Sequence, residues 1–200
     1  MKVAITGATG LVGSNLAVQL VEAGHEVICT KRSSSKIDHL KAFPIQWVSG
    51  DVTNLQSLIA AFQGATAVFH CAAQISFLKK ATPNIVETNI EGTRNVIRAV
   101  REQKVERLVH CSSVVACAIS ENGQPVTEDL PWNFDKFGMD DSYSSTKYQS
   151  QQIVLKASNE IDAVIVNPTY MLGPFDPKPS SGQLILDVIK GRVPGVTTGM

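Results

Sequence analysis

The sequence predicts a doubly wound α/β fold, in which helices cover both faces of a parallel sheet. Two observations support this prediction. Short apolar runs of strand-like character alternate with helix-like runs along most of the 200 residues, and this alternation is typical of right-handed crossovers between parallel strands. The first strand-like run also ends in three glycines at a spacing of three, Gly7, Gly10 and Gly13. A strand, a tight turn and a helix therefore open the chain.

The opening unit comprises an apolar strand over residues 3–5 and a helix over about 11–23, which Gly24 ends. Glycines in the turn between them permit positive φ and let a ligand approach the backbone closely. Unpaired N–H groups and the dipole at a helix start attract an anion, of which the pyrophosphate of a dinucleotide is the natural case. The spacing is G-x-x-G-x-x-G rather than the usual G-x-G-x-x-G, so a glycine-rich turn without a ligand remains an alternative.

The remaining elements follow the same alternation. Asn54 is a candidate N-cap, Pro83 suits the first turn of a helix, and Gly64 suits a helix end. The polar stretch from Gly123 to Gly138 has no clear period and is expected to be a long loop, which in compact domains is usually functional or disordered. Strands are expected at 26–30, 45–48, 67–71, 107–111 and 163–167, and helices near 36–42, 54–62, 83–101 and 142–159. This order predicts a Rossmann sheet with its ligand crevice beyond the ends of strands one, four and five.

Composition and charge narrow the possible partners. The 18 basic and 18 acidic side chains leave no net charge, and without a basic stripe we expect binding to neither nucleic acid nor a membrane surface. The sequence has neither a signal-peptide pattern nor an apolar stretch long enough to span a bilayer. The cysteines lack the spacing of a disulfide framework, so reduced thiols in a cytoplasmic protein are expected. They are Cys29, Cys71, Cys111 and Cys117.

Two His-Cys pairs at strand ends, at 70–71 and 110–111, raise the question of a metal site. Adjacent residues of a strand point to opposite faces, so neither pair can readily chelate one ion. Buried cysteines usually behave as small hydrophobic side chains. We therefore expect no metal at these positions.

The residues after the second and third strands indicate which dinucleotide is bound. The position after the second strand, which meets the adenosine ribose, favours an acidic residue for NAD and an arginine for NADP. Here Lys31 and Arg32 occupy it, and the planar guanidinium of Arg32 suits a phosphate. NADP is therefore predicted over NAD, with a solvated pair of surface charges as the alternative. Asp51 and Val52 would bind and flank the adenine, or Asp51 would cap the next helix.

A second group of polar residues surrounds the expected end of strand five. Ser112 and Ser113 end that strand, and Tyr143 and Lys147 lie four apart near the start of a helix. Residues at this spacing face the same side of a helix. A free tyrosine has a pKa near ~10, and a nearby ammonium favours the phenolate and lowers that pKa. Tyr143 would then serve as a proton donor and acceptor, whereas an exposed helix pair is the alternative.

Together these motifs identify the chain as similar to the extended short-chain dehydrogenase/reductases, a family of NAD(P)-dependent oxidoreductases, epimerases and dehydratases. The matching motifs occur in the order of the family and span nearly the whole chain: TGATGLVG at 6–13, GDV at 50–52, HCAA at 70–73, NIEGTRN at 89–95, CSS at 111–113, YSSTK at 143–147 and NPT at 167–169. Arg32 and residues 167–176 most resemble the dihydroflavonol-4-reductase-like branch.

The resemblance implies a role for each matching residue. Tyr143 is expected to donate or accept the proton, and Lys147 to bind the nicotinamide ribose and lower the pKa of the tyrosine. Ser113 is expected to orient the reacting oxygen, with Ser112 as the alternative, and Asn89 to secure the backbone. The residues expected to contact the cofactor are Gly7, Thr9, Gly10, Leu11, Val12, Gly13, Arg32, Asp51, Val52, Cys71, Ala72, Ala73, Lys147, Pro168 and Thr169.

The resemblance also implies how the chain is organised and what it does. Residues 1–170 are expected to form an NADP-binding domain with the catalytic residues, and residues 171–200 to begin a truncated substrate-binding region. The expected reaction transfers hydride between nicotinamide and a secondary alcohol or ketone, a small-molecule substrate. The alternatives are a nucleotide-sugar epimerase or dehydratase with tightly held NAD(P), and a non-catalytic NADP-sensing protein. Helices 83–101 and 143–159 would build a four-helix interface in a homodimer, which is frequent in the family.

Overall fold

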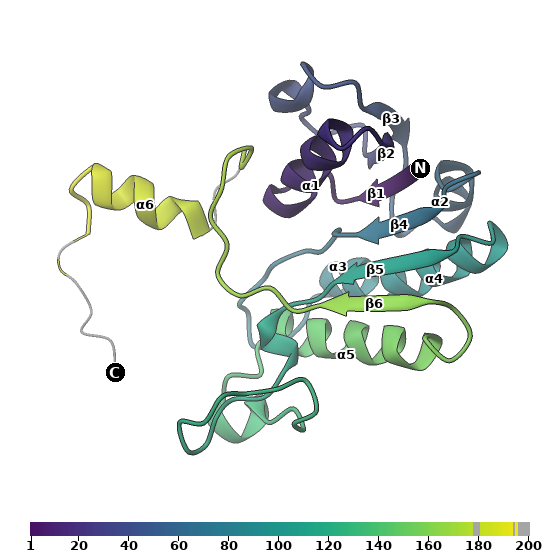
Figure 1. Ribbon diagram of the computed structural model, residues 1–200. Coiled ribbons are helices and arrows are strands. Elements are labelled where there is room, and N and C mark those ends of the chain that lie inside the picture. The colour runs from purple at the N-terminus through teal and green to yellow at the C-terminus, as the bar shows by residue number, and fades with distance from the viewer. Residues whose placement is uncertain (178–180, 194, 196–200) are drawn as a thin grey trace.

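The computed structural model describes residues 1–177, 181–193 and 195, and it confirms the doubly wound α/β fold (Figure 1). Six parallel strands lie in the order β3-β2-β1-β4-β5-β6. The order reverses between β1 and β4, and in such sheets the ligand crevice lies outside the carboxyl ends of the strands at this point. The strands are β1 (Lys2–Thr6), β2 (Glu26–Lys31), β3 (Gln46–Ser49), β4 (Ala67–His70), β5 (Arg107–Cys111) and β6 (Ala163–Val166).

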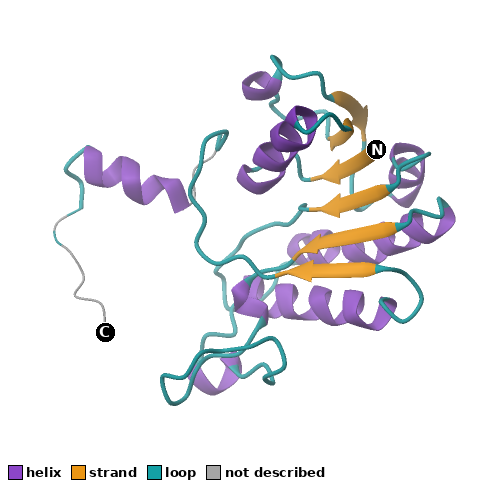
Figure 2. Ribbon diagram, in the orientation of Figure 1, coloured by secondary structure: helices purple, strands orange, loops and turns teal. Residues whose placement is uncertain are grey.

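Helices cover both faces of the sheet, as Figure 2 shows. α1 and a short 3-10 turn, η1, lie on one face, whereas α2, α4 and α5 pack on the other. Their bounds are α1 (Leu11–Glu22), η1 (Asp38–Leu40), α2 (Leu55–Ala61), α4 (Gly92–Glu102) and α5 (Ser142–Ala157). Two hydrophobic cores result. Leu58, Phe62 and Leu108 are fully buried in the larger core, and Ile5 and Leu40 in the smaller one.

The central strand carries the sequence signature of burial on both faces. Val3, Ala4 and Ile5 of β1 are at most 1% exposed, which agrees with an apolar run that lacks polar alternation. Each parallel strand returns through a crossover, so all carboxyl ends lie at the same edge of the sheet. The glycine motif and the polar residues after β5 therefore meet at one edge, although they lie far apart in the sequence.

Polar side chains at the helix starts position two helices. Asn54, the predicted N-cap, accepts a hydrogen bond of 3.1 Å from the Ser57 N–H at the start of α2. Asp141 accepts bonds of 2.9 and 2.8 Å from the Tyr143 and Ser144 N–H groups at the start of α5. An acidic cap satisfies free N–H groups and complements the positive end of the helix dipole. The cap fixes the start of α5 and thereby the direction in which the Tyr143 side chain projects from the first turn.

The helix predicted over 83–101 is interrupted by a π-helical turn. It forms as α3 (Pro83–Val86), η2 (Glu87–Glu91) and α4, with Pro83 in the first turn as expected. At the junction the Thr93 hydroxyl donates a 2.7 Å bond to the Asn89 carbonyl. Turns of this kind are rare inside helices and often lie at functional sites.

Two other segments differ from the sequence prediction. The helix expected near 36–42 is only the 3-10 turn η1, because Pro44 follows closely and disfavours a helical conformation just before it. A helix that was not predicted, α6 (Ser181–Ile189), lies apart from the sheet (Figure 1). Of the expected substrate-binding region 171–200, residues 178–180, 194 and 196–200 lie outside the described residues. Within the described ranges, no helix is long and apolar enough to cross a membrane.

The long loop before α5 is held in place by aromatic stacking. Trp132 stacks face to face on Tyr148 of α5, with ring centroids 4.7 Å apart, and on Phe134 at 5.6 Å. Its Nε1–H donates a 3.0 Å bond to the Val115 carbonyl. Two 3-10 turns, η3 (Val114–Ala116) and η4 (Phe134–Phe137), lie in the loop. Because these contacts order the loop against α5, it can line a site there.

Candidate active site

Two of the three predicted glycines are required by the packing of the turn. Gly7 has a φ of +75°, and a Cβ on it would lie 2.5 Å from the Ala72 nitrogen. A Cβ on Gly13 would lie 2.4 Å from the Gly7 carbonyl oxygen. Backbone atoms cannot move aside to relieve contacts this short. β1, α1 and the end of β4 therefore pack together only with glycine at these positions.

Gly10 differs, because no neighbour fills the space beside it. A Cβ there would meet only the Gly7 carbonyl oxygen, at an ordinary distance of 3.6 Å. Gly10 is the N-cap of α1 and no side chain caps this helix, so its first N–H groups can receive a ligand. A phosphate group fits here, because it accepts N–H bonds and complements the helix dipole. Thr9, Leu11 and Val12, also predicted to contact the cofactor, lie in the same turn and are partly exposed.

Arg32 directly follows β2 and has an exposed side chain. It forms no ion pair with any residue that the structure describes. Its backbone is fixed by Ser35, whose hydroxyl accepts a 3.1 Å bond from the Arg32 N–H and whose N–H donates a 3.0 Å bond to the Arg32 carbonyl. An ordered backbone thus carries an accessible guanidinium at the predicted ribose position.

The structure corrects one of the two expectations for Asp51. Its Oδ1 accepts bonds from the Thr53 N–H at 3.0 Å and the Thr53 hydroxyl at 2.9 Å, whereas Asn54 caps α2. The cap hypothesis for Asp51 is wrong, because the chain makes a further turn before the helix begins. Val52 is 7% exposed and packs on Gly92, where a Cβ would lie 2.8 Å from Val52 Cγ2. Most of the Val52 side chain therefore belongs to the core.

The segments that follow β4 and β6 bring the other predicted cofactor residues to the same edge. Ala72 lies against Gly7, and the Pro168 carbonyl accepts a 3.0 Å bond from the Val114 N–H. The predicted residues here are Cys71, Ala72, Ala73, Pro168 and Thr169, all of them partly or fully exposed. These segments thus lie at the sheet edge that also carries the glycine turn and the end of β5.

Ser113, rather than Ser112, contacts Tyr143. Ser112 is 2% exposed, and its hydroxyl donates a 2.6 Å bond to Gln151 Oε1 on α5. The Ser113 side chain forms a hydrogen bond with Tyr143 and accepts a 3.4 Å bond from the Val115 N–H. The structure therefore separates two serines that the sequence leaves equivalent.

Lys147 follows Tyr143 by one turn of α5 and is buried, with 5% of its surface exposed. Its Nζ donates a 2.8 Å hydrogen bond to the Cys111 carbonyl at the end of β5. Burial lowers the pKa of the ammonium, and the Cys111 and Cys71 side chains oppose that shift. Lys147 therefore ties α5 to the carboxyl end of β5.

The predicted lowering of the Tyr143 pKa by Lys147 is not found in this structure. Burial raises the pKa of Tyr143, the hydrogen bond with Ser113 lowers it, and the charges of Cys111 and Asp141 raise it; the net shift is upward. The ammonium of Lys147 is instead directed to the Cys111 carbonyl. Tyr143 is therefore protonated at neutral pH, which is the state that a proton donor requires.

Asn89 has the contacts of a residue that secures the backbone. Its Oδ1 accepts a 2.7 Å bond from the Gln74 N–H, and its Nδ2 donates to the Gln74 carbonyl at 2.9 Å and to Thr146 Oγ1 at 3.0 Å. The Thr146 hydroxyl in turn donates a 2.7 Å bond to the Ser142 carbonyl. The sequence did not single out Thr146. Through these bonds the π-helical turn, the loop after β4 and the start of α5 form one connected unit.

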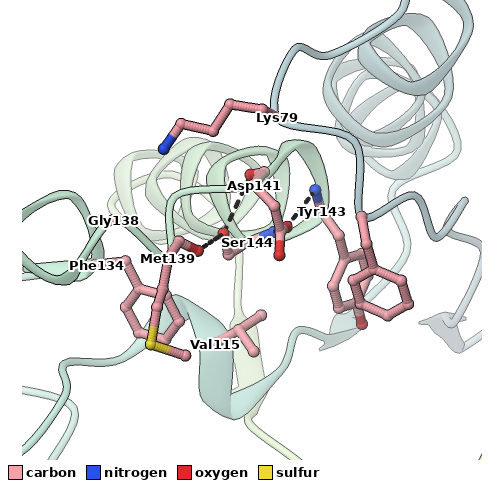
Figure 3. A pocket seen from close by; sticks show the side chains of 9 residues that line it. Lys79, Val115, Phe134, Gly138, Met139, Asp141, Tyr143 and Ser144 are labelled. Carbon is pink, nitrogen blue, oxygen red and sulfur yellow. Dashed lines mark hydrogen bonds between the residues drawn. The ribbon is translucent and has the colours of Figure 1, made fainter.

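A cavity of about 430 Å³ opens beside Tyr143. Figure 3 shows Phe134, Met139 and Val115 toward one side of it and Tyr143 on the other. The Phe77 ring meets the Tyr143 ring edge to face, with centroids 6.2 Å apart. The side chains of Phe77, Phe134, Met139 and Val115 therefore form an apolar part of the cavity beside Tyr143, to which Asp141 and Ser144 add polar groups.

Lys79 also lines the cavity and forms an ion pair with Asp140. Lys79 and the apolar lining were not predicted from the sequence, because they lie in irregular segments without a periodic pattern. Their convergence depends on the path of two loops, one after β4 and one before α5. One sequence feature could have pointed to this cavity, namely the aromatic residue Phe77 in a segment without a strand or helix pattern.

His70 and His110 lie side by side on β4 and β5, with ring centroids 5.1 Å apart. His70 Nδ1 is 2.8 Å from Thr6 Oγ1 and its Nε2 is 3.1 Å from Thr93 Oγ1, whereas neither ring nitrogen of His110 has a protein partner among the described residues. Burial lowers the pKa of His70 to about 3 and that of His110 well below its ordinary value, and the charge of Lys147 adds to both shifts. Both rings are therefore neutral at pH 7. In the described part of the chain, no three His, Cys, Asp or Glu side chains gather as a metal ion would need.

Comparisons with known proteins show the family to which the chain belongs. Residues 3–193 match the model of the NAD dependent epimerase/dehydratase family. The chain is 37% identical over 199 residues to a protein named "Putative dihydroflavonol 4-reductase" from Synechocystis sp., and the match covers 98% of this chain and 57% of the relative.

Two solved structures extend the comparison. That of gox2253 is 34% identical, with a TM-score of 0.85 over 96% of this chain and 58% of the other. The Bordetella bronchiseptica enzyme WbmH, in complex with NAD+, is 25% identical, with a TM-score of 0.79 over 96% of this chain and 63% of the other. The chain thus spans less than two thirds of the length of each of these proteins. With its glycine turn at α1 and its Ser, Tyr and Lys at one sheet edge, the chain belongs to the NAD-dependent epimerase/dehydratase family of extended short-chain dehydrogenase/reductases.

Proposed function

We propose that this chain carries the cofactor site and the catalytic residues of an NADP-dependent oxidoreductase, which transfers hydride between nicotinamide and a secondary alcohol or ketone. The observation that carries the proposal is the contact between Ser113 and Tyr143 at a mostly apolar cavity. Reduction of a carbonyl requires a proton donor and a hydrogen-bond donor at its oxygen. These two side chains supply both.

In the direction of reduction, Tyr143 donates its phenolic proton to the carbonyl oxygen, and the Ser113 hydroxyl donates a hydrogen bond to the same oxygen. A bound nicotinamide supplies the hydride. The raised pKa of Tyr143 keeps the proton on the phenol until the substrate oxygen gains negative charge. Lys147, fixed to the end of β5 through the Cys111 carbonyl, is assigned to the ribose of the cofactor.

The cavity lining supports an apolar ring ketone as substrate over a sugar nucleotide. The Phe77, Phe134 and Met139 side chains offer no strong hydrogen-bond donor or acceptor. A sugar hydroxyl placed against them would lose its bonds to water without replacement, which is unfavourable. An aromatic or alicyclic ring would instead gain from the removal of apolar surface from water.

The accessible guanidinium of Arg32 supports NADP over NAD, because a 2′-phosphate can form charge-assisted bonds with it. The first experiment titrates NADPH and NADH into the purified chain and follows nicotinamide fluorescence, for the wild type and Arg32→Ala. We expect NADPH to bind more tightly than NADH, and the substitution to weaken NADPH roughly tenfold or more. Arg98→Ala, which removes an exposed arginine of α4, is the matched control.

Equal or tighter binding of NADH would contradict the NADP assignment. The catalytic assignment has its own test, in which Tyr143→Phe is compared with Tyr148→Phe in a screen of ring ketones. Tyr143→Phe should lower kcat by roughly 10²–10⁴-fold while NADPH still binds. Unchanged turnover in Tyr143→Phe would overturn the role of this residue.

The family match supports a second candidate, a nucleotide-sugar epimerase or dehydratase that holds NAD(P) tightly. Such an enzyme would retain its cofactor through purification and would consume no NADPH overall. A non-catalytic NADP-sensing protein would bind the cofactor and show no turnover with any substrate. Measurement of bound cofactor after purification, followed by the ketone screen, separates the three.

The proposal includes a homodimer formed through α4 and α5. A groove of about 330 Å³ lies between these helices, with Ile97, Ile153 and Ala157 in its lining, and Leu155 of α5 is 46% exposed. Sedimentation velocity should give a dimer for the wild type and a monomer for Leu155→Glu. Leu130→Glu, at a similarly exposed loop residue, is the control and should remain dimeric.

We also assign residues 171–200 to the start of a substrate-binding region. The segment after β6 returns to α1, where Asn15 Nδ2 donates a 2.7 Å bond to the Pro174 carbonyl. Phe175 meets Phe43, which follows η1, edge to face at 5.7 Å. A segment on this path lies at the sheet edge that holds the cofactor and substrate residues. The expected partner is a small molecule, and the four free cysteines support a reducing, cytoplasmic location.

A further inference from the structure

Two cysteines lie side by side at the edge of the sheet that faces the proposed cofactor site. The register of β4 and β5 pairs His70 with His110. Cys71 and Cys111 are the next residues along these two strands. Neighbouring strands lie about 4.8 Å apart, and a disulfide joins Cα atoms about 4.4–6.8 Å apart. The two thiol groups also interact, since each shifts the pKa of the other. The separation that the register gives their Cα atoms therefore lies within the range that a disulfide joins.

Both cysteines also contact the parts of the site that position the cofactor. The peptide between Cys71 and Ala72 packs on Gly7, where a Cβ would lie 2.6 Å from the Cys71 carbonyl carbon. The Cys111 carbonyl accepts the 2.8 Å bond from Lys147. A movement of the backbone at Cys71 would therefore displace the glycine turn, and a movement of the backbone at Cys111 would displace Lys147.

The chemistry of this pair differs from that of the other two cysteines. The hydrogen bond with Cys71 and the charge of Lys147 lower the pKa of Cys111 to about 7, against the effect of burial. The hydrogen bond with Cys111, together with burial, raises the pKa of Cys71 well above its ordinary value. At neutral pH Cys111 is thus partly ionised beside a Cys71 that keeps its proton, and both residues are partly exposed. This is the arrangement of a reactive pair.

Cys29 and Cys117 serve as internal comparisons. Both are buried. Burial raises the pKa of Cys29 to about 12 and also raises that of Cys117 above its ordinary value. Because only the thiolate is an effective nucleophile, neither residue should react at neutral pH.

We propose that Cys71 and Cys111 form a peroxide-sensitive dithiol, and that its oxidation to a disulfide opposes binding of the nicotinamide cofactor. The second half of this proposal rests on the proposed function, whereas the first half does not. The Cys111 thiolate attacks one oxygen of hydrogen peroxide, the O–O bond breaks, and the leaving hydroxide takes up a proton to become water. Cys111 is then a sulfenic acid.

Once Cys111 is a neutral sulfenic acid, its negative charge no longer raises the pKa of Cys71. The Cys71 thiol then gives up its proton as its sulfur attacks the sulfenic sulfur in the second step. The S–S bond forms, the S–O bond breaks, and a second water leaves with the proton of the Cys71 thiol. Peroxide gains the two electrons that the two sulfur atoms lose. A dithiol reagent returns those electrons by exchange and restores both thiols.

The opposition between oxidation and cofactor binding follows from the position of the pair. A covalent S–S bond draws the two sulfur atoms closer than their present contact, and the adjoining backbone must adjust. That adjustment acts on the Cys71–Ala72 peptide against Gly7 and on the carbonyl that holds Lys147. A cofactor bound at this edge would in turn cover the two thiols and slow their reaction with peroxide.

The first test treats the reduced chain with hydrogen peroxide and identifies the product by intact mass and peptide mapping. We expect a Cys71–Cys111 cross-linked peptide in the wild type and in Cys117→Ser, and its loss after treatment with dithiothreitol. Cys71→Ser should instead accumulate a sulfenic acid at Cys111, trapped by dimedone. Cross-links or trapped sulfenic acid at other cysteines, or no reaction at Cys111, would overturn the dithiol.

The second test titrates NADPH into the reduced and the oxidised chain. Oxidation should weaken binding by at least roughly fivefold, and saturating NADP+ should slow cross-link formation by peroxide. Equal NADPH affinity of the reduced and the oxidised chain would overturn the claim that oxidation weakens cofactor binding. If the reduced chain bound neither NADPH nor NADH, both the proposed function and the claim that oxidation weakens cofactor binding would fail. The claim that Cys71 and Cys111 form a disulfide would stand or fall on the peptide mass alone.

Discussion

The Nζ atom of Lys147 lies 2.8 Å from the carbonyl oxygen of Cys111, so a buried ammonium on α5 holds the carboxyl end of β5. A side chain without a hydrogen-bond donor at residue 147 would remove this bond from the carbonyl. A buried acceptor without a partner is unfavourable. The lysine therefore has a structural role in addition to the proposed contact with the cofactor.

Lys147→Met tests that double role. Methionine has a similar volume and adapts to irregular spaces, so the fold should be retained. We expect NADPH affinity to fall and kcat to fall by at least about 10²-fold, measured by fluorescence titration and steady-state kinetics. Lys156→Met, at an exposed position of the same helix, should change neither. A Lys147→Met enzyme with normal turnover would contradict the assignment.

Substitution of two glycines in one turn should separate folding from cofactor binding. Gly13→Ala places a Cβ 2.4 Å from the Gly7 carbonyl oxygen and should lower the free energy of unfolding by about 1–3 kcal/mol. Gly10→Ala meets only an ordinary 3.6 Å contact, so its main effect should be weaker binding of NADPH. Urea denaturation and fluorescence titration of both variants check the two effects. If Gly10→Ala lowered the free energy of unfolding as much as Gly13→Ala, the space beside Gly10 would not be free for a ligand.

The buried histidines should make the stability depend on acid pH. In the unfolded chain a histidine binds a proton below about pH 6.5, whereas the folded-state pKa of His70 is about 3 and that of His110 is also well below its ordinary value. The unfolded state therefore binds more protons between these limits. For His70 the stabilisation is complete above about pH 6.5 and is lost as the pH falls toward 3, by roughly 1.4 kcal/mol per pH unit. The lowered pKa of His110 acts in the same direction.

Urea denaturation at a series of pH values between 7.5 and 4.5 measures this slope. His70→Asn keeps an acceptor for the Thr6 hydroxyl and removes one titrating group, so its slope should be clearly smaller than that of the wild type. The same substitution at His25, which is partly exposed, is the control. A slope that His70→Asn leaves unchanged would exclude His70 as its source.

The stack of Trp132 on Tyr148 should determine the order of the loop that lines the cavity. Trp132→Ala removes both stacks and the bond to the Val115 carbonyl, whereas Trp132→Phe retains an aromatic ring. Hydrogen exchange across residues 114–139 should quicken strongly in the alanine variant and less in the phenylalanine variant. Unchanged exchange in Trp132→Ala would show that other contacts, such as those of Asn133, are sufficient.

Much of the fold and part of the site could be predicted from the sequence, because the relevant signals are local. The apolar runs, the glycine spacing, the cap at Asn54 and the first-turn position of Pro83 each depend on a few neighbouring residues, and the structure has them as predicted. The π-helical turn around Asn89 was not predictable in this way. It depends on side-chain bonds to Gln74 and Thr146, which lie in other segments.

The sequence by itself determined the doubly wound sheet, the glycine turn and the spacing of Tyr143 and Lys147, because periodicity and spacing act within single elements. Only the tertiary structure decided between Ser112 and Ser113, since one bonds to Gln151 and the other to Tyr143. It also reversed the expected pKa shift of Tyr143, because burial and the direction of the Lys147 ammonium depend on packing between α5 and β5. Contacts between distant segments set charge, access and reactivity, and no local pattern encodes them.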